Sequence, residues 1–159
     1  MKQVHLQNLF AIMAFCSLAF AGCSEVAYPN TPEGVFRKML DASIERDIDK
    51  AVSTLPTDEE LEHLADTPAQ LGKFRKKRDE SIKKMIDEFT HVNENSHASL
   101  HFWYEDDFKC NKIEEVKNGY DIAIAEVSVT VCERRSGEIM RDRVTGQFIR
   151  VNGRWINSL

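Results

Sequence analysis

The stretch NGYDIAIAEVSVTVCERRSG, residues 118–137, decides the fold of this chain. It begins with Asn-Gly and ends with Ser-Gly, dipeptides that favour tight turns between antiparallel strands. Between them, small and β-branched apolar residues occupy alternate positions from Ala123 to Val131. Alternation with a period of two places these side chains on one face of a strand. The stretch therefore predicts a long strand that covers the core and leads into a hairpin at each end.

The second half of the chain carries one more strong hairpin signal, Asn152-Gly153. The turn signals divide this half into expected strands at 98–109, 111–117, 120–133, 138–151 and 154–158. Strands in series with short connections favour an antiparallel sheet.

The first half of the chain has helical signals instead. Thr31-Pro32 is an N-cap followed by proline at the first helical position, and apolar residues follow at helical spacing. Thr57 and Thr67 each stand three residues before Glu or Gln, the spacing of a capping box. Helices at about 32–90 followed by strands at about 98–158 predict an α+β fold with the helices on one face of the sheet. The expected core residues are Phe36, Leu40, Val129, Phe148 and Trp155.

The N-terminal segment reads as a targeting peptide. The uncharged run Leu9–Ala21 has 13 residues, whereas a membrane-spanning helix needs about 20. Ala19-Phe20-Ala21 fits ordinary signal peptidase, which would leave Gly22 first and Cys23 as a free thiol. Alternatively, Phe20-Ala21-Gly22-Cys23 resembles the lipobox of bacterial lipoproteins, in which the cysteine becomes the lipidated first residue.

Cysteine parity favours the lipobox. Cleavage there removes Cys16, uses Cys23 as the anchor and leaves Cys110 and Cys132 as a pair in an oxidising compartment. We therefore expect a signal peptide at 1–22, a lipidated N-terminus and tether at 23–31, and a single domain at 32–159. By the same resemblance, Ser24 after the cysteine indicates the outer membrane, with the domain facing the periplasm.

The charge balance excludes one class of partner. Without Lys2, which leaves with the signal peptide, 20 basic residues face 26 acidic ones, a net charge of −6. Nucleic-acid binders carry the opposite balance. The basic run KFRKKR at 73–78 predicts a solvated helix surface, with contact to anionic headgroups or an acidic partner as the alternative.

The region that runs from TPEGVFRKMLDASIERDIDKAVSTL (31–55) through the closing GQFIRVNGRWINSL (146–159) resembles the nuclear-transport-factor-two-like superfamily. The nearest resemblance is to bacterial lipoproteins whose domain ends in a Gly-x-Trp hairpin, here Gly153-Arg154-Trp155. It implies a cone, in which helices pack on the concave face of a curved antiparallel sheet, often with a pocket at the open end. The candidate pocket residues are Phe102, Tyr104, Asp106, Phe148 and Trp155.

Two functions follow from these observations. The first is a lipid-anchored, non-catalytic envelope domain that binds a small apolar ligand or an envelope protein. The alternative is an acid–base enzyme of the isomerase or dehydratase type, because that superfamily contains such enzymes and Tyr104 and Asp106 share one strand face. The criterion between them is whether Asp106 lies in a closed apolar pocket. No cofactor or metal is expected, because His97 and His101 lie about 13 Å apart on a strand.

The two remaining cysteines are expected to form a disulfide, on compartment and parity. The strand register opposes it. A two-residue turn at Asn118-Gly119 places Cys110 opposite Val127, about 16 Å along the strand from Cys132. The bond therefore requires a bulge or a chain reversal near Lys109–Lys112, or a strand order in which 98–110 does not simply extend 111–117.

Overall fold

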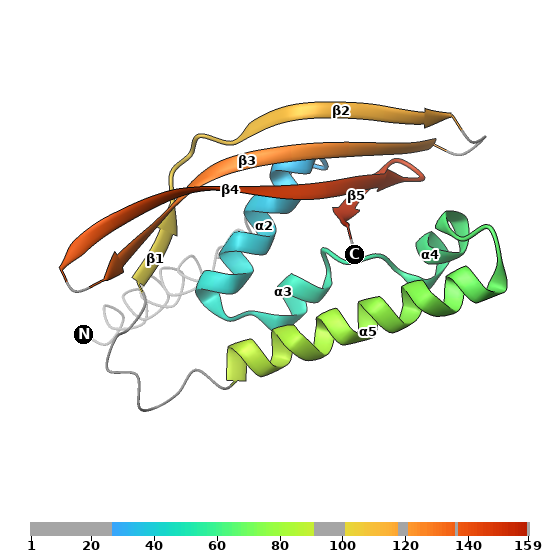
Figure 1. Ribbon diagram of the computed structural model, residues 1–159, viewed down its shortest axis with the longest axis horizontal. Helices are drawn as coiled ribbons and strands as arrows, with labels where there is room; N and C mark the ends of the chain where they lie inside the picture. Colours follow the sequence, from blue (N-terminus) through green and yellow to red (C-terminus); the bar gives the residue numbers. More distant parts are fainter. Residues whose placement is uncertain (1–26, 91–100, 118–120, 136, 159) are drawn as a thin grey trace, which may run out of the picture.

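The strand predicted from the alternating stretch is the centre of the sheet. The computed structural model describes residues 27–90, 101–117, 121–135 and 137–158. Its elements are α2 (Pro32–Glu45), α3 (Ile48–Val52), α4 (Asp58–Leu64), α5 (Pro68–Thr90), β1 (His101–Tyr104), β2 (Lys109–Lys117), β3 (Asp121–Arg135), β4 (Glu138–Val151) and β5 (Arg154–Asn157). The fold is α+β, with a curled antiparallel sheet arching over the helices (Figure 1).

Every strand pairing in the sheet is antiparallel. β3 pairs with β4 along their whole lengths, and β4 pairs with β5 across Asn152-Gly153. Both turn residues have positive φ, 50° and 79°, as a type I′ hairpin requires. β1 and β2 pair one after the other with the opposite edge of β3.

Two expected strand boundaries were wrong. The chain leaves the sheet after Tyr104 and re-enters at Lys109, so Lys109 and Cys110 belong to β2 rather than to a strand at 98–109. Lys117 pairs with Asp121, not Tyr120, so three residues connect β2 to β3. A bulge between Cys110 and Lys112 then shifts the register by one, which restores the pairing of Cys110 with Val127.

The core lies between α2 and the concave face of the sheet. Its members are the buried side chains of Val35, Phe36, Leu40, Ala123, Ala125, Val127, Val129, Phe148 and Trp155. The five core residues predicted from the sequence are all among them. Phe36 contacts the ring of Phe148 at a centroid distance of 5.3 Å, so aromatic side chains fill the space beneath the sheet.

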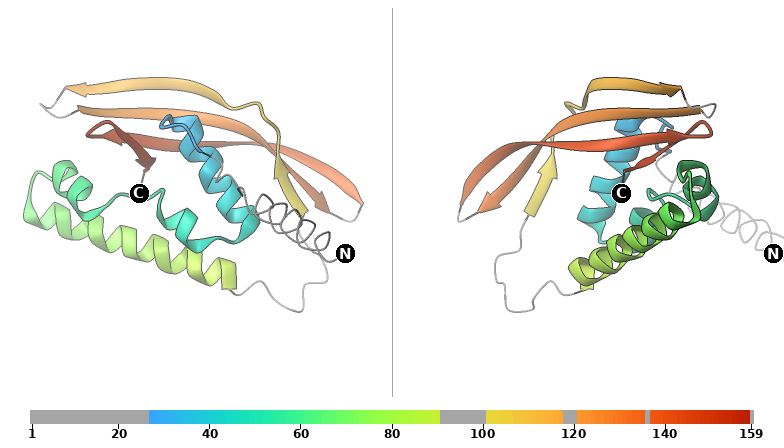
Figure 2. Two further views of the ribbon diagram at one scale, coloured as in Figure 1. Left: turned by 180° about the vertical axis from the view of Figure 1, so that it is seen from behind. Right: turned by 45° about the vertical axis from the view of Figure 1, so that its right-hand side comes forward.

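The longest helix, α5, forms an outer layer. It lies across α3 and α4 on the side away from the sheet, as two further views show (Figure 2). None of its side chains is fully buried. Polar contacts to α4 compensate in part, because Arg75 pairs with Asp58 and Glu62, and Arg78 also pairs with Asp58. Over the described residues, no helix has the length and apolar character of a membrane span.

Candidate functional site

A polar hollow lies beside α2 and α3, and it is built around Asp41. Leu40, the preceding residue on α2, is buried in the core, and Asp41 is turned toward the rim. Its carboxylate accepts hydrogen bonds from two tyrosine hydroxyls: Tyr28 at 2.7 Å and Tyr104 at 2.6 Å. Tyr28 belongs to the segment before α2, and Tyr104 ends β1. One carboxylate therefore joins the N-terminal segment, α2 and the sheet.

The two tyrosines are hydrogen-bond donors, not bases. Burial, together with the hydrogen bond to Asp41, raises the pKa of Tyr104 to about 12. The same causes raise the pKa of Tyr28. Both hydroxyls therefore keep their protons at neutral pH, and the arrangement fixes the chain segments that carry them.

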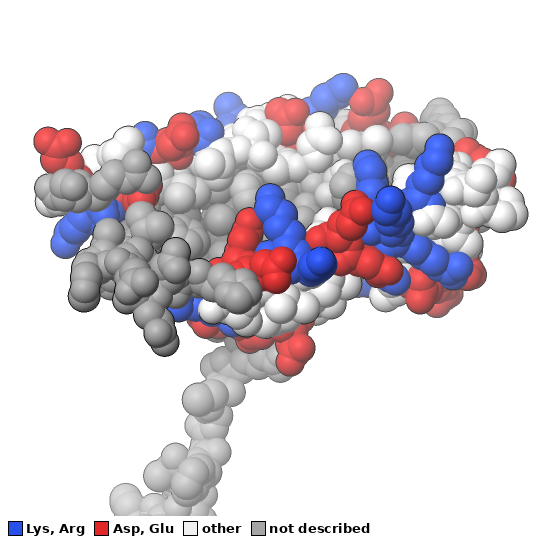
Figure 3. Space-filling view, turned by 60° about the horizontal axis from the view of Figure 1, so that its bottom comes forward, with Lys and Arg blue, Asp and Glu red and all other residues white. Residues whose placement is uncertain are grey.

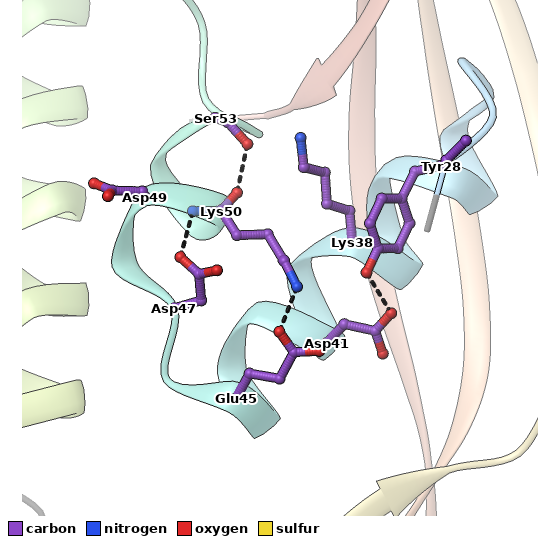
Figure 4. A pocket seen from close by; sticks show the side chains of 9 residues that line it. Tyr28, Lys38, Asp41, Glu45, Asp47, Asp49, Lys50 and Ser53 are labelled. Carbon is purple, nitrogen blue, oxygen red and sulfur yellow. Dashed lines mark hydrogen bonds and ion pairs between the residues drawn. The ribbon is translucent and has the colours of Figure 1, made fainter. Parts of the chain in front are cut away.

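The hollow has a volume of about 750 Å³ and is open to solvent. Its lining residues are Ala27, Tyr28, Lys38, Asp41, Glu45, Asp47, Asp49, Lys50 and Ser53 (Figure 4). Most of its acids have structural partners: Asp47 caps α3 by accepting from the Lys50 amide, and Glu45 pairs with the Lys50 ammonium. Asp49 points away from Asp41 in Figure 4. Among the described residues, no group of acids, histidines or cysteines is arranged to hold a metal ion.

Asp106, one of the two residues of the acid–base alternative, lies on the surface. Its side chain is 79% exposed and pairs with Arg37, whose guanidinium lies over the ring of Phe108 at 4.6 Å. The closed pocket that the acid–base alternative requires around Tyr104 and Asp106 is therefore not formed by the described residues, because Asp106 is exposed and Tyr104 donates to Asp41 instead.

The five candidate pocket residues do not converge on one cavity. Phe148 is completely buried, and Trp155 is 7% exposed at the end of the core. Phe102 is partly buried on β1, two residues before Tyr104. Phe148 and Trp155 close the core rather than line an enclosed chamber.

A clasp before α2 was missed in the sequence, where residues up to 31 read as a free tether. The side chain of Asn30 donates to the carbonyl of Gly153 at 2.7 Å and accepts from the amide of Trp155 at 3.0 Å. Asn30 thus binds the β4–β5 hairpin, while Tyr28 binds Asp41. No local pattern predicts either contact, because the partners lie far along the chain.

Arg154 has a role that the Gly-x-Trp pattern alone does not reveal. Its guanidinium donates to both carboxylate oxygens of Glu60, at 2.9 and 2.8 Å. It also donates to the carbonyls of Ser53 at 2.7 Å and Leu55 at 3.3 Å. Glu60 itself closes the capping box with Thr57 at the start of α4. Arg154 therefore fastens β5 to the end of α3 and the beginning of α4.

Between α5 and the α3–α4 connection lies an apolar groove with a volume of about 460 Å³. Its lining residues are Val52, Ser53, Leu55, Pro56, Thr57, Arg78, Ile82 and Arg154. Both guanidinium groups have polar partners, Asp58 for Arg78, and Glu60 with the carbonyls of Ser53 and Leu55 for Arg154. The two arginines therefore contribute mainly their stems to the walls. The groove therefore presents a mostly apolar surface to solvent.

The expected disulfide between Cys110 and Cys132 is not formed in the structure, where both are free thiols. Cys110 on β2 pairs with Val127 of β3, and Val127 lies five residues before Cys132 on that strand. Because the separation is an odd number of residues, the two thiols lie on opposite faces of the sheet. The bulge between Cys110 and Lys112 does not close this gap, because its one-residue shift only cancels the extra residue in the β2–β3 turn. Burial raises the pKa of both thiols, which disfavours the reactive thiolate.

The basic run is part of a mixed surface. Lysines and arginines alternate with acids on the face that includes α5 (Figure 3). Lys76 and Lys84 pair with acids one turn along the helix, while Arg75 and Arg78 reach α4. This supports the prediction of a solvated helix surface over that of a dedicated anion site.

Comparison of the chain with protein-family models, curated proteins and solved structures finds no match in any of the three.

Proposed function

We propose that this protein is a lipid-anchored protein of the bacterial cell envelope whose α+β domain binds a protein partner close to the membrane. The clasp of Tyr28 and Asn30 carries this proposal. Tyr28 is fixed to α2 through Asp41, and only four residues lie between Tyr28 and Cys23. At about 3.5 Å per residue, five steps of extended chain reach about 18 Å. A lipid on Cys23 would therefore hold the domain directly at the bilayer surface.

The fold part of the proposal is a cone-like domain of the nuclear-transport-factor-two-like type. The curled sheet with helices on its concave side supports it. The filled core disfavours a buried apolar ligand, because α2 and the aromatic rings beneath the sheet occupy the place where such a ligand would bind. This supports a surface that recognises a protein. On the resemblance of the N-terminal segment to bacterial lipoproteins, we place the anchor in the outer membrane and the domain in the periplasm.

The anchor is tested by Cys23→Ser with a clickable fatty-acid analogue. The native protein should incorporate the analogue and fractionate with membranes, because one covalent diacylglycerol and one N-acyl chain hold stably. The variant should lose the label. Ser24→Ala is the matched control and should keep it. Labelling of the Cys23→Ser protein at the native level would overturn the proposal.

A small apolar ligand is the second candidate, and the groove beside Ile82 is the observation that favours it. Native mass spectrometry of the protein released gently from its own membranes separates the two. A bound polypeptide supports the partner, whereas a retained small molecule supports the ligand.

A further inference from the structure

One edge of the sheet is left open. β5 pairs with β4 only from Phe148 to Val151, and the amide of Ser158 adds one bond to the carbonyl of Gln147. No other described segment pairs with β4 on this side between Glu138 and Gly146. In an antiparallel strand, alternate residues direct their N–H and C=O groups away from the existing partner. This run therefore offers a row of unpaired backbone groups.

The side chains that usually protect an edge are drawn away from it. Charged residues on edge strands normally discourage pairing with another chain. Here Arg141 reaches across β3 to Glu105 at 3.1 Å, and Arg143 reaches Asp107 at 2.6 Å. Both arginines are thus neutralised on the far side of β3.

The outer edge of β2 provides a contrast. It carries a bulge beside Cys110 and two lysines, Lys109 and Lys112. Bulges and lysines are two devices by which native edges avoid pairing. Of these two edges, β4 is the less protected.

The exposed side chains of the open edge indicate what it would accept. Ile139 is 43% exposed and Met140 is 52% exposed, one on each face of β4. Glu138 and Asp142 share the face of Met140, and neither meets a cation among the described residues. In Figure 1 this end of the β3–β4 hairpin extends beyond the described helices. Among the described side chains, the charge at the edge that no ion pair compensates is therefore negative, and it lies beside exposed apolar side chains.

A second copy of this chain fits the middle of the edge poorly. Two copies that join their β4 strands antiparallel about a twofold axis would place one residue opposite itself. An axis at Asp142 sets the two Asp142 carboxylates against each other, and an axis at Met140 sets Asp142 against Glu138. Like charges directly opposite each other destabilise a strand pair.

We infer that the open edge of β4, Glu138–Gly146, binds an extended segment of another protein that alternates basic and apolar residues. The segment would add a strand to the sheet through backbone hydrogen bonds, with a basic side chain opposite Asp142. This inference names the chemistry of the partner in the proposed function. It rests on that function for one point, that the partner is a protein.

The test uses the full-length protein in mild detergent and a fluorescent nine-residue peptide of alternating lysine and valine. Saturable binding is expected. A glutamate–valine peptide should bind at least tenfold more weakly, and a lysine–valine peptide with a central proline should not bind, since proline removes a backbone donor. Asp142→Lys should weaken binding at least tenfold, and Asp142→Asn should weaken it by less.

The control Glu114→Lys makes the same charge change on β2 and should alter binding less than twofold. Circular dichroism establishes that each variant is folded. Equal binding of the lysine and glutamate peptides would overturn the inference, as would Asp142→Lys binding at the native level. A native dimer that Asp142→Lys dissociates would also overturn it, because the occupant would then be a second copy. The peptide result is independent of fatty-acid labelling, so failure of the edge and failure of the anchor are distinguishable.

Discussion

Individual residues hold this fold together at points that are distant in sequence. Arg154 fastens β5 to α3 and α4, and Asn30 fastens the entering chain to the β4–β5 hairpin. The sequence predicted the buried core residues because burial follows from hydrophobic periodicity. It predicted neither of these polar contacts, because a polar side chain carries no mark of a partner some hundred residues away.

Replacing Arg154 with methionine should destabilise the fold. The Glu60 side chain is only 9% exposed, and without Arg154 its carboxylate would remain buried without a cation. Removal of one partner of a buried ion pair typically costs several kcal/mol, and we expect about 3 kcal/mol here. Urea unfolding measures the change. The matched control Arg75→Met removes exposed pairs and should cost about 1 kcal/mol or less. Equal losses for the two variants would contradict the role assigned to Arg154.

Asp107 should make the stability depend on pH in the acid range. Its carboxylate accepts the amide and hydroxyl of Thr130 and pairs with Arg143, which lowers its pKa from 3.8 to about 2. A lowered pKa in the folded state stabilises the fold above the pKa of the unfolded state. That stabilisation is lost as the pH falls from about 4 toward 2.

The comparison of native protein with Asp107→Asn measures this effect. At pH 6 the native protein should be the more stable to urea, and the difference should shrink as the pH approaches 2. A constant difference for Asp107→Asn would show that the carboxylate's charge is not what matters.

Among the elements, α5 differs most from the rest. It is held by ion pairs and a partly covered apolar stripe rather than by burial. Its existence followed from the Thr67 cap and helical periodicity. Its position did not, because an amphipathic stripe does not specify which surface will cover it. The five strands were predicted as strands and in their order along the chain. Their boundaries differ from the prediction because a bulge and a longer turn have no strong local signal in the sequence.

The amides of α5 should exchange with solvent before those of β3. Segments with few buried contacts open at lower free energy than core strands. Hydrogen exchange followed by mass spectrometry compares the two, and exchange from α5 should rise further with salt, since salt screens exposed ion pairs. Protection of α5 equal to that of β3 would mean that another surface covers this helix.

At the scale of the whole molecule, two features bear on function: a short N-terminal connection and an open strand edge. The clasp of Tyr28 and Asn30 fixes where the chain enters the domain. The β4 edge from Glu138 to Gly146 lies on the β3–β4 hairpin, in the sheet that arches over the helices. We therefore expect a domain held beside the bilayer that receives a segment of another protein at this edge.

The lipid anchor is tested most directly by the mass of the N-terminal peptide of the mature protein, purified from membranes. We predict a peptide that begins at Cys23 and carries the added mass of a thioether-linked diacylglycerol and an N-acyl chain. A peptide that begins at Gly22 with an unmodified Cys23 would contradict it, as would an intact chain that begins at Met1.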